Sequence, residues 1–293
     1  RQLRPDVLIV DSIQTVHTTG LPGAPGTLSQ VRECAAVLTD AVRESGAALF
    51  LAGHVTKDGA LAGPKTLEHM VDTVLYFEGS RDREVRILRS FKNRFGNVNE
   101  IGVFLMRQEG LLEVHDPEGL FVDKLSAPGP GAALTAALEG NRVLLAEIQA
   151  LVTGSGGGAP GRMVDGIEPT RALRIKAIID HASGSGLGDR DVFVNVAGGL
   201  SIREPAVDLA IAMAMTSSAR GIPVGREAVF LGELSLLGDL RRVSQCEKRI
   251  QQAKKLGIPT VVLPEANRKD CAGIAGIELV FIATLKDATA AVF

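Results

Sequence analysis

Lys92 and Arg94 are the residue pair in this chain whose types and spacing best suit the binding of an anion. They lie two positions apart in the stretch 90–97, SFKNRFGN. On an extended strand or its edge, such side chains point to the same face. Two cations on one face repel each other unless an anion lies between them. The stretch is therefore either a solvated, charged strand end or a phosphate-binding pair, with Phe91 and Phe95 anchoring a turn that the following glycine allows.

Asp11 is a second candidate, because it ends a continuous apolar run at 7–10 and is followed by Ser12. A carboxylate at the C-terminal end of a buried strand lies at the sheet edge where α/β folds bind ligands. There it can hold the Mg²⁺ of a nucleotide through water. Many buried strands, however, end in Asp only to cap the next turn. Asp11 and Ser12 are thus candidate nucleotide and Mg²⁺ ligands, with turn capping as the alternative.

Residues 59–66, GALAGPKT, look like the phosphate loop G-x-x-x-x-G-K-[ST] but depart from it. The second glycine stands one place early, and Pro64 occupies the required position. Proline has no N–H to offer a phosphate. No other stretch fits the pattern, so we expect the phosphate loop of any ATPase core to lie outside this chain.

Short apolar runs alternate with helical patterns, which is typical of an α/β fold. The first part predicts a largely parallel sheet that turns antiparallel at one edge. Residues 126–132, SAPGPGA, can continue neither a helix nor a strand and predict an interdomain linker before a second α/β unit. The expected elements are strands at 6–13, 47–55, 70–78 and 83–91, a helix at 28–45, and further segments at 141–152, 170–183, 191–198, 204–219, 228–236, 246–257, 260–265 and 277–285.

Composition narrows the class of protein. A chain of 293 residues can hold two domains with separate cores. Although 45% of the residues are hydrophobic, no apolar run reaches the ~18 to 20 residues of a membrane span. The N-terminal residues show no signal-peptide pattern. Three scattered cysteines, Cys34, Cys246 and Cys271, favour a reducing cytoplasm and argue against a zinc site in this chain. A net charge of −2 neither indicates nor excludes a nucleic-acid partner.

Four stretches resemble, in order, the bacterial DNA-repair ATPases of the RadA family, also called Sms. They are LIVDSIQTV (8–16), the segment 29–59, KTLEHMVDTVLYFEG (65–79) and ILRSFKNRFGNVNEIGVF (87–104). The resemblance runs over essentially the whole chain. It includes the K-N-R-F-G motif that marks the family, here Lys92, Asn93, Arg94, Phe95 and Gly96.

The resemblance implies a particular domain order. The family has an N-terminal four-cysteine zinc finger, a RecA-like ATPase core and a C-terminal domain similar to the protease domain of Lon. This chain would then hold the C-terminal part of the RecA-like core at 1–125, with a mostly parallel sheet. A linker at 126–132 and a Lon-protease-like α/β domain at 133–293 would follow. The zinc finger, the phosphate loop and the catalytic-glutamate region would precede the chain.

The resemblance also assigns roles to single residues. Asp11 matches the Walker B aspartate that orients Mg²⁺, and His54 stands where RecA-like proteins keep a polar sensor of the γ-phosphate. A satisfied, buried histidine is the alternative for His54. The loops at 17–27 and 55–63, the latter with Lys57, correspond to loops that line the channel of RecA-like rings. They are candidate single-strand contacts, with ordinary surface loops as the alternative.

For the opening stretch, the resemblance favours a catalytic role. RecA-like rings place such a pair of cations at the subunit boundary, where it reaches the γ-phosphate of the neighbour's ATP in the manner of an arginine finger. Lys92 and Arg94 are therefore expected to act in catalysis together with His54.

The second unit resembles the Lon protease domain but lacks its catalytic pair. A Lon-type peptidase needs a serine nucleophile and a lysine that takes its proton. Ala206 stands at the serine position and Glu247 at the lysine position, with Lys248 one residue away. A one-residue shift on a helix turns a side chain by about 100°. We expect a scaffold for assembly and DNA binding rather than a peptidase. Its candidate phosphate contacts, with a solvated helix face as the alternative, are Arg162, Arg171, Arg174, Lys176 and Arg190.

The favoured function is an ATP-driven hexameric ring motor that acts on single-stranded DNA and promotes branch migration during recombinational repair. It implies ATP or ADP with Mg²⁺ as cofactor, and zinc only in the missing finger. The expected partners are single-stranded DNA, recombination intermediates and the recombinase RecA, in the cytoplasm. The alternative is a non-motor DNA-binding or assembly module built on the Lon-like ring. This chain alone is expected to hydrolyse no ATP.

Overall fold

The computed structural model describes residues 5–54, 67–79, 84–98, 100–115, 117, 120–122, 129–154, 162–183, 187–224 and 227–293. Contacts divide the chain into two compact units. The first unit comprises Arg1–Tyr76 and Ser90–Val98, and the second comprises Phe77–Arg89 and Asn99–Phe293. The division predicted from sequence stays a prediction, and residues 126–128 of its linker lie outside the described residues.

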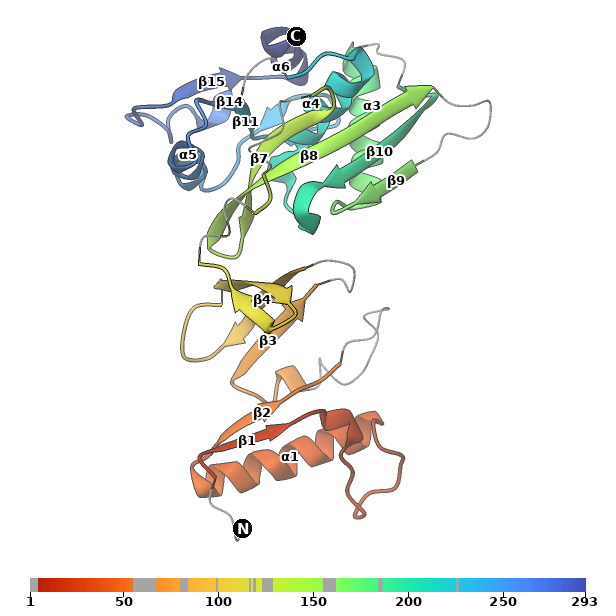
Figure 1. The fold of residues 1–293 in the computed structure, drawn as a ribbon, viewed down its shortest axis with the longest axis vertical. Helices are drawn as coiled ribbons and strands as arrows, with labels where there is room; N and C mark the ends of the chain where they lie inside the picture. Colours follow the sequence, from red (N-terminus) through yellow and green to blue (C-terminus); the bar gives the residue numbers. More distant parts are fainter. Residues whose placement is uncertain are drawn as a thin grey trace. The chain divides into compact units, whose positions relative to one another are not determined.

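Two parallel strands and one long helix form the first unit (Figure 1). β1 (Val7–Val10) pairs in parallel with β2 (Ala48–Leu51), and α1 (Leu28–Ser45) connects them after the short helix η1 (Ile13–Thr15). The helix ends because Gly46 adopts a left-handed conformation with φ of 73°, which favours glycine. Buried residues of α1 pack against Ile13, directly after β1, so the small core lies beside the strand end that carries Asp11.

A four-stranded sheet follows, in the order β3-β4-β5-β6. Neighbours β4 and β5, and β5 and β6, are antiparallel. These strands form a sheet separate from the parallel pair β1-β2, whereas the sequence predicted one sheet with an antiparallel edge. The boundary between the two units falls within β3 and β4. The strands are β3 (Thr73–Glu78), β4 (Val85–Asn93), β5 (Ile101–Arg107) and β6 (Gly110–Glu113).

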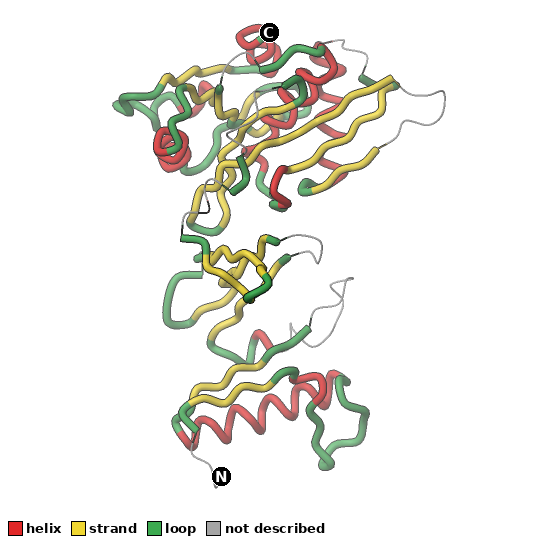
Figure 2. The backbone as a smooth tube through the Cα atoms, viewed as in Figure 1, coloured by secondary structure: helices red, strands yellow, loops and turns green. Residues whose placement is uncertain are grey.

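A seven-stranded sheet organises the second unit, in the order β15-β14-β11-β7-β8-β10-β9 (Figures 1 and 2). Four of its six neighbouring strand pairs are parallel. The α/β class expected from the sequence is therefore confirmed. The strands are β7 (Ala132–Glu139), β8 (Arg142–Gly154), β9 (Arg162–Asp165), β10 (Arg190–Val196), β11 (Ala228–Phe230), β14 (Thr260–Pro264) and β15 (Glu278–Ile282).

Helices cover both faces of this sheet. Leu144 of β8 packs in a cluster with α3 and α4, whereas its neighbour Leu145 packs in a cluster with α5. Successive strand side chains point to opposite faces, so α3 and α4 lie on one face and α5 on the other (Figure 1). The remaining elements are α3 (Pro169–Ser183), η3 (Ala197–Gly199), η4 (Pro205–Val207), α4 (Asp208–Arg220), β12 (Glu233–Leu234), β13 (Leu240–Arg241), α5 (Cys246–Lys255), η5 (Glu265–Asn267) and α6 (Leu285–Val292).

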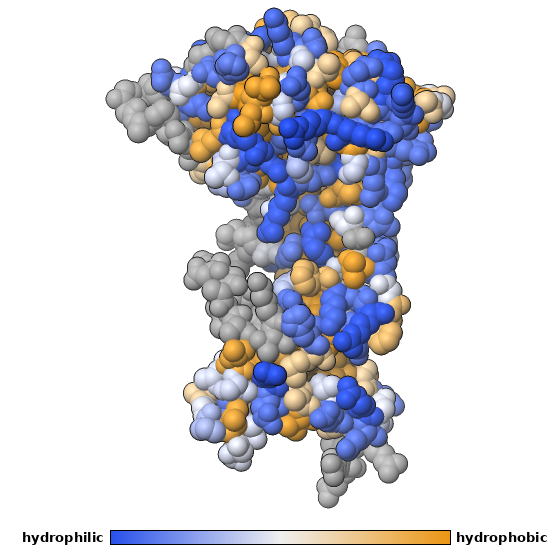
Figure 3. All heavy atoms as spheres, turned by 180° about the vertical axis from the view of Figure 1, so that it is seen from behind, coloured by the Kyte–Doolittle hydropathy of each residue, from blue (hydrophilic) through white to orange (hydrophobic). Residues whose placement is uncertain are grey.

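Hydrophilic and hydrophobic side chains are interspersed over the described surface in the view of Figure 3. Among the described helices, none combines the length and apolar character that crossing a membrane requires.

Candidate functional site

Asp11 lies at the C-terminal end of β1, where the two parallel strands of the first unit end together. Its side chain is exposed, whereas Ser12 is buried at 5% exposure. The peptide bond between them is cis. Two backbone hydrogen bonds fasten the strand ends, from Ala52 N to the Val10 carbonyl (2.9 Å) and from Ile13 N to the Ala52 carbonyl (3.0 Å). Of the two residues, Asp11 is therefore the one placed to meet a ligand in solution.

His54 follows the end of β2 and is exposed, so the interpretation as a buried, satisfied histidine is wrong. Its carbonyl accepts a hydrogen bond from Gln14 Nε2 at 3.3 Å. Gln14 comes from the segment after Asp11, and its Oε1 is buried with no partner among the described residues. The sequence analysis missed Gln14. Its position in DSIQ, three residues after the aspartate at the same sheet edge, is the signal that could have found it.

The first candidate DNA loop, residues 17–27, is held in place by Gln30 of α1. This side chain is 1% exposed and bonds both backbone groups of Thr18, accepting from its N–H at 2.9 Å and donating to its carbonyl at 3.1 Å. It also donates to the Leu21 carbonyl at 2.6 Å. His17 is exposed beside these contacts. The second candidate loop, 55–63 with Lys57, lies outside the described residues, as does the phosphate-loop look-alike at 59–66.

Lys92 and Arg94 both contact the segment 68–72. Lys92 Nζ donates to the carbonyls of Glu68 and Val71 at 2.6 and 2.7 Å. The Arg94 guanidinium donates to Asp72 Oδ1 at 2.9 Å, and its backbone N–H donates to the Asp72 carbonyl at 3.0 Å. Each cation therefore has its own acceptor within the first unit.

The turn after these cations is closed differently from the prediction. Phe95 is 83% exposed and anchors nothing in the described structure, so its predicted role is wrong. Asn93 Oδ1 accepts from Phe95 N at 3.1 Å and thereby closes the turn. Phe91 does pack, with its ring 5.2 Å from that of Tyr76 in an edge-on contact. Gly96 lies close to the Asn93 amide, where an added Cβ would stand 3.0 Å from Nδ2.

The region around Ala206 in the second unit contains a buried ion pair. Ala206 is 6% exposed and offers no hydroxyl. Nearby, Glu204 forms a two-pronged pair with Arg249, with both N–O distances 2.7 Å. The Arg249 side chain is fully buried, and it also donates to the carbonyls of Ala136 and Ser244. The sequence analysis missed this pair, which crosslinks α5 to β7 and to the approach to α4.

Asp208, at the start of α4, is a second buried charge. Burial raises its pKa to about 6, although the Leu234 N–H at 3.2 Å and the guanidinium groups of Arg171 and Arg174 oppose the shift. These guanidinium nitrogens lie 3.7 and 3.9 Å from its carboxylate oxygens. Asp208 Oδ1 and Arg171 Nε have no hydrogen-bond partner in the described structure. The carboxylate is thus only partly compensated.

Lys176 and Arg171, which were predicted to contact DNA, instead form hydrogen bonds within the fold. Lys176 is 6% exposed, and its ammonium donates to the carbonyls of Gly188 and Arg190 at 3.1 and 2.8 Å. The Arg171 side chain is 11% exposed and donates to the Glu204 carbonyl. Neither presents its charge to a DNA backbone, because each stabilises the fold.

Of the other predicted contacts, Arg174 remains 46% exposed. Arg190 begins β10 and donates to the Ala219 carbonyl at 3.4 Å. Arg162 begins β9, and its side chain lies outside the described atoms.

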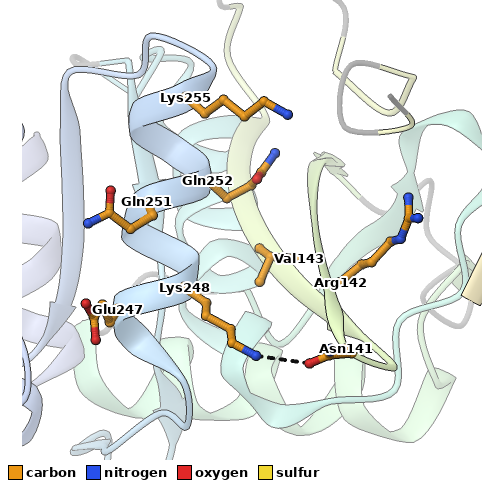
Figure 4. Close-up of a pocket in the computed structure, with 8 residues that line it drawn as sticks. All are labelled: Asn141, Arg142, Val143, Glu247, Lys248, Gln251, Gln252 and Lys255. Carbon is orange, nitrogen blue, oxygen red and sulfur yellow. Dashed lines mark hydrogen bonds between the residues drawn. The ribbon is translucent and has the colours of Figure 1, made fainter. Parts of the chain in front are cut away.

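A groove of about 450 Å³ lies between α5 and the β7–β8 turn (Figure 4). Three cations line it: Arg142, Lys248 and Lys255. Lys248 Nζ donates to Asn141 Oδ1 at 3.0 Å, and Glu247 also lines the groove (Figure 4). Glu247, at the predicted lysine position, is exposed. The groove thus carries three cations and one carboxylate.

Comparison with known proteins places the chain. A family model for subunit ChlI of Mg-chelatase matches residues 167–267. The DNA repair protein RadA of Bacillus subtilis is 45% identical over 288 residues, which is 98% of this chain and 63% of that protein. RadA of Pseudomonas aeruginosa is 44% identical over 293 residues, 100% of this chain and 64% of that protein. RadA of Streptococcus pneumoniae is 42% identical over 292 residues, 100% of this chain and 70% of that protein.

The chain thus spans somewhat less than two thirds of the length of most of these relatives. Their identity extends through both units of the fold. The chain belongs to the family of DNA repair proteins called RadA.

Proposed function

We propose that this chain is part of an ATP-driven DNA repair motor that assembles as a hexameric ring, acts on single-stranded DNA and promotes branch migration of recombination intermediates. The observation that carries the proposal is the cluster at the end of β1 and β2. Asp11 is exposed there, and Gln14 bonds His54 across the two strand ends. This edge of a parallel pair is where α/β folds bind nucleotides.

The residues at this edge suit a nucleotide with Mg²⁺. The Asp11 carboxylate is a hard oxygen ligand that would hold the ion through water. The buried Gln14 Oε1, which has no partner among the described residues, and the exposed His54 would orient water and phosphate oxygens by hydrogen bonds. The bound ion would supply charge stabilisation for phosphoryl transfer.

Lys92 and Arg94 are proposed to act on the nucleotide of a neighbouring subunit. Their present acceptors are two carbonyl dipoles and one carboxylate. A γ-phosphate carries more charge than any of these and forms stronger charge-assisted hydrogen bonds. The pair would therefore move from the segment 68–72 to the phosphate when a loaded neighbour docks.

DNA contacts in the second unit are proposed at exposed cations only. Arg142, Lys248 and Lys255 line one groove, and Arg174 is partly exposed on α3. Exposed cations bind the phosphates of the DNA backbone largely independently of the base sequence. We also propose that the recombinase RecA is a partner and that the protein acts in the cytoplasm.

A non-motor assembly module is the second candidate, because Ala206 offers no hydroxyl at the position predicted for a Lon-type nucleophile. ATP hydrolysis by the full-length protein, with and without single-stranded DNA, separates the two. The motor proposal expects DNA-stimulated turnover that Asp11→Asn abolishes while particle mass stays that of a ring. Ring assembly with no turnover above a buffer blank would instead favour the scaffold.

A further inference from the structure

Two of the three cysteines meet inside the second unit although they lie 25 positions apart. Cys246 begins α5, and Cys271 follows η5. The Cys271 thiol donates to Cys246, with the two Sγ atoms 3.1 Å apart. The side chains are 4% and 3% exposed, and both cysteines are free. Cys34 lies in the first unit on α1 and takes no part in the pair.

Hydrogen bonds that involve no sulfur hold together the two segments that carry these thiols. Asn267 is fully buried, and its side chain accepts from Val243 N and donates to the Val243 carbonyl, both at 2.9 Å. Its own carbonyl accepts from Cys271 N at 3.2 Å. These hydrogen bonds of Asn267 hold the two thiols close to each other before any disulfide forms. Closing them to a disulfide needs a movement of only about 1 Å, because bonded sulfurs lie about 2 Å apart.

The same surroundings lower the reactivity of the two reduced thiols. Burial, and then the hydrogen bond with Cys246, raises the pKa of the Cys271 thiol to about 12. The thiolate, which is the reactive form, is therefore scarce at neutral pH. Oxidation should therefore be slow and should depend on local opening of the structure around the two cysteines. Once one sulfur has reacted, the hydrogen bonds of Asn267 favour formation of the disulfide, because they keep the second sulfur close.

We propose that Cys246 and Cys271 are a modification site that closes to a disulfide when the protein meets a two-electron oxidant of the peroxide class. One thiol reacts with hydrogen peroxide to give a sulfenic acid and one water. The other sulfur attacks the sulfenic sulfur, the S–S bond forms, and a second water leaves. In total two thiols lose two hydrogens and one peroxide becomes two waters. The bond ties the first turn of α5 to the segment after η5.

The expected consequence is a more rigid α5. The bond encloses α5 and β14 in one covalent loop and so restricts the unfolded chain. Lys248 and Lys255 of the basic groove lie on this helix, so oxidation would also limit the movement of that groove wall.

Thiol mapping of the whole chain tests the proposal. The protein is treated with hydrogen peroxide, unfolded in an alkylating agent and digested, and its peptides are weighed. The expected product is one cross-linked pair that contains Cys246 and Cys271, two hydrogens lighter than the reduced peptides, with Cys34 alkylated. The midpoint of thermal unfolding should rise by several degrees, and dithiothreitol should reverse both changes.

Variants supply the controls. Cys34→Ser should keep the cross-link and the shift, whereas Cys246→Ala and Cys271→Ala should each lose both. If the alanine variants do not fold, the wild-type map decides alone. Separate alkylation or separate sulfinic acids at Cys246 and Cys271 would overturn the proposal, as would cross-links through Cys34. A cross-link without a thermal shift would refute the locking of α5.

Discussion

The Glu204–Arg249 ion pair lies inside the second unit, with the Arg249 side chain fully buried. Arg249 has no exposed side-chain surface, so its charge depends on the Glu204 carboxylate and on two carbonyls. Removing one partner of a buried pair leaves an uncompensated charge, which typically costs about 3 to 5 kcal/mol, whereas removing both is often nearly neutral.

We therefore expect Glu204→Gln to lower the free energy of unfolding strongly, and the double variant Glu204→Gln with Arg249→Met to recover part of the loss. Urea unfolding of the four members of the cycle measures this. Glu265→Gln, in the exposed pair with Arg268, is the matched control and should change little. A loss in the double variant equal to the sum of the two single losses would show that the two side chains are not coupled.

Asp208 predicts a pH dependence. Its folded pKa of about 6 is raised above the usual value of 3.8, so the folded state holds the proton more tightly than the unfolded state. Stability from this group is thus present below pH 3.8 and is lost as pH rises through about 6. Relative to Asp208→Asn, the wild type should lose on the order of 3 kcal/mol across this window.

Paired unfolding curves of wild type and Asp208→Asn at several pH values check this sign. Because every other carboxyl is common to both proteins, their difference isolates Asp208. Asp40→Asn, which removes an exposed carboxylate on α1, serves as the control for the loss of one negative charge. A flat difference would mean that Arg171 and Arg174 offset the effect of burial on the carboxylate, and a difference of the opposite slope would mean that they outweigh it.

At the level of elements, the basic groove beside α5 tests the proposed role in DNA binding. If Lys248 and Lys255 contact phosphates, replacing each by Ala should weaken binding to unrelated sequences alike. Each lost contact should reduce the slope of log affinity against log salt by about 1. Fluorescence anisotropy at several salt concentrations measures this, and Lys269→Ala, exposed outside the groove, controls for net charge. Equal salt slopes in all variants would remove the groove from the DNA-binding surface.

Some elements could be predicted from sequence because their signals are local. The helix at 28–45 was found with correct ends, since amphipathic spacing fills it and Gly46 stops it. In contrast, β7 (Ala132–Glu139) was missed, because its run of Ala and Leu has no strand alternation. Tertiary pairing with β8 and β11 makes it a strand.

The candidate site shows the same limit. Asp11 and His54 follow apolar strands and could be identified from the sequence. Gln14 carries a weaker signal, its place in DSIQ, and its contact with His54 joins residues 40 positions apart. Arg249 could not be identified, because it acquires its role from a partner 45 positions away. Lys176 was misjudged for the same reason, since a lysine on an amphipathic helix resembles an exposed one until its carbonyl acceptors are located.

At the scale of the whole molecule, the proposed ATP hydrolysis depends on cooperation between subunits. Asp11, Gln14 and His54 would serve one nucleotide, whereas Lys92 and Arg94 would serve the neighbour's. Lys92→Ala removes the hydrogen bonds of a partly buried ammonium to the Glu68 and Val71 carbonyls, so it should lower the free energy of unfolding by about 1.5 to 3 kcal/mol. Turnover should fall on the order of a thousandfold by analogy with arginine fingers.

Mixing two inactive subunits of the full-length protein tests this claim most directly. One carries Lys92→Ala, and the other is disabled only in its phosphate loop. In a mixed ring, some interfaces pair an intact phosphate loop with an intact Lys92, so part of the DNA-stimulated ATP hydrolysis should return. If assembled mixed rings remain as inactive as either parent, Lys92 acts within its own subunit or on DNA, and the proposed role in a neighbouring site is wrong.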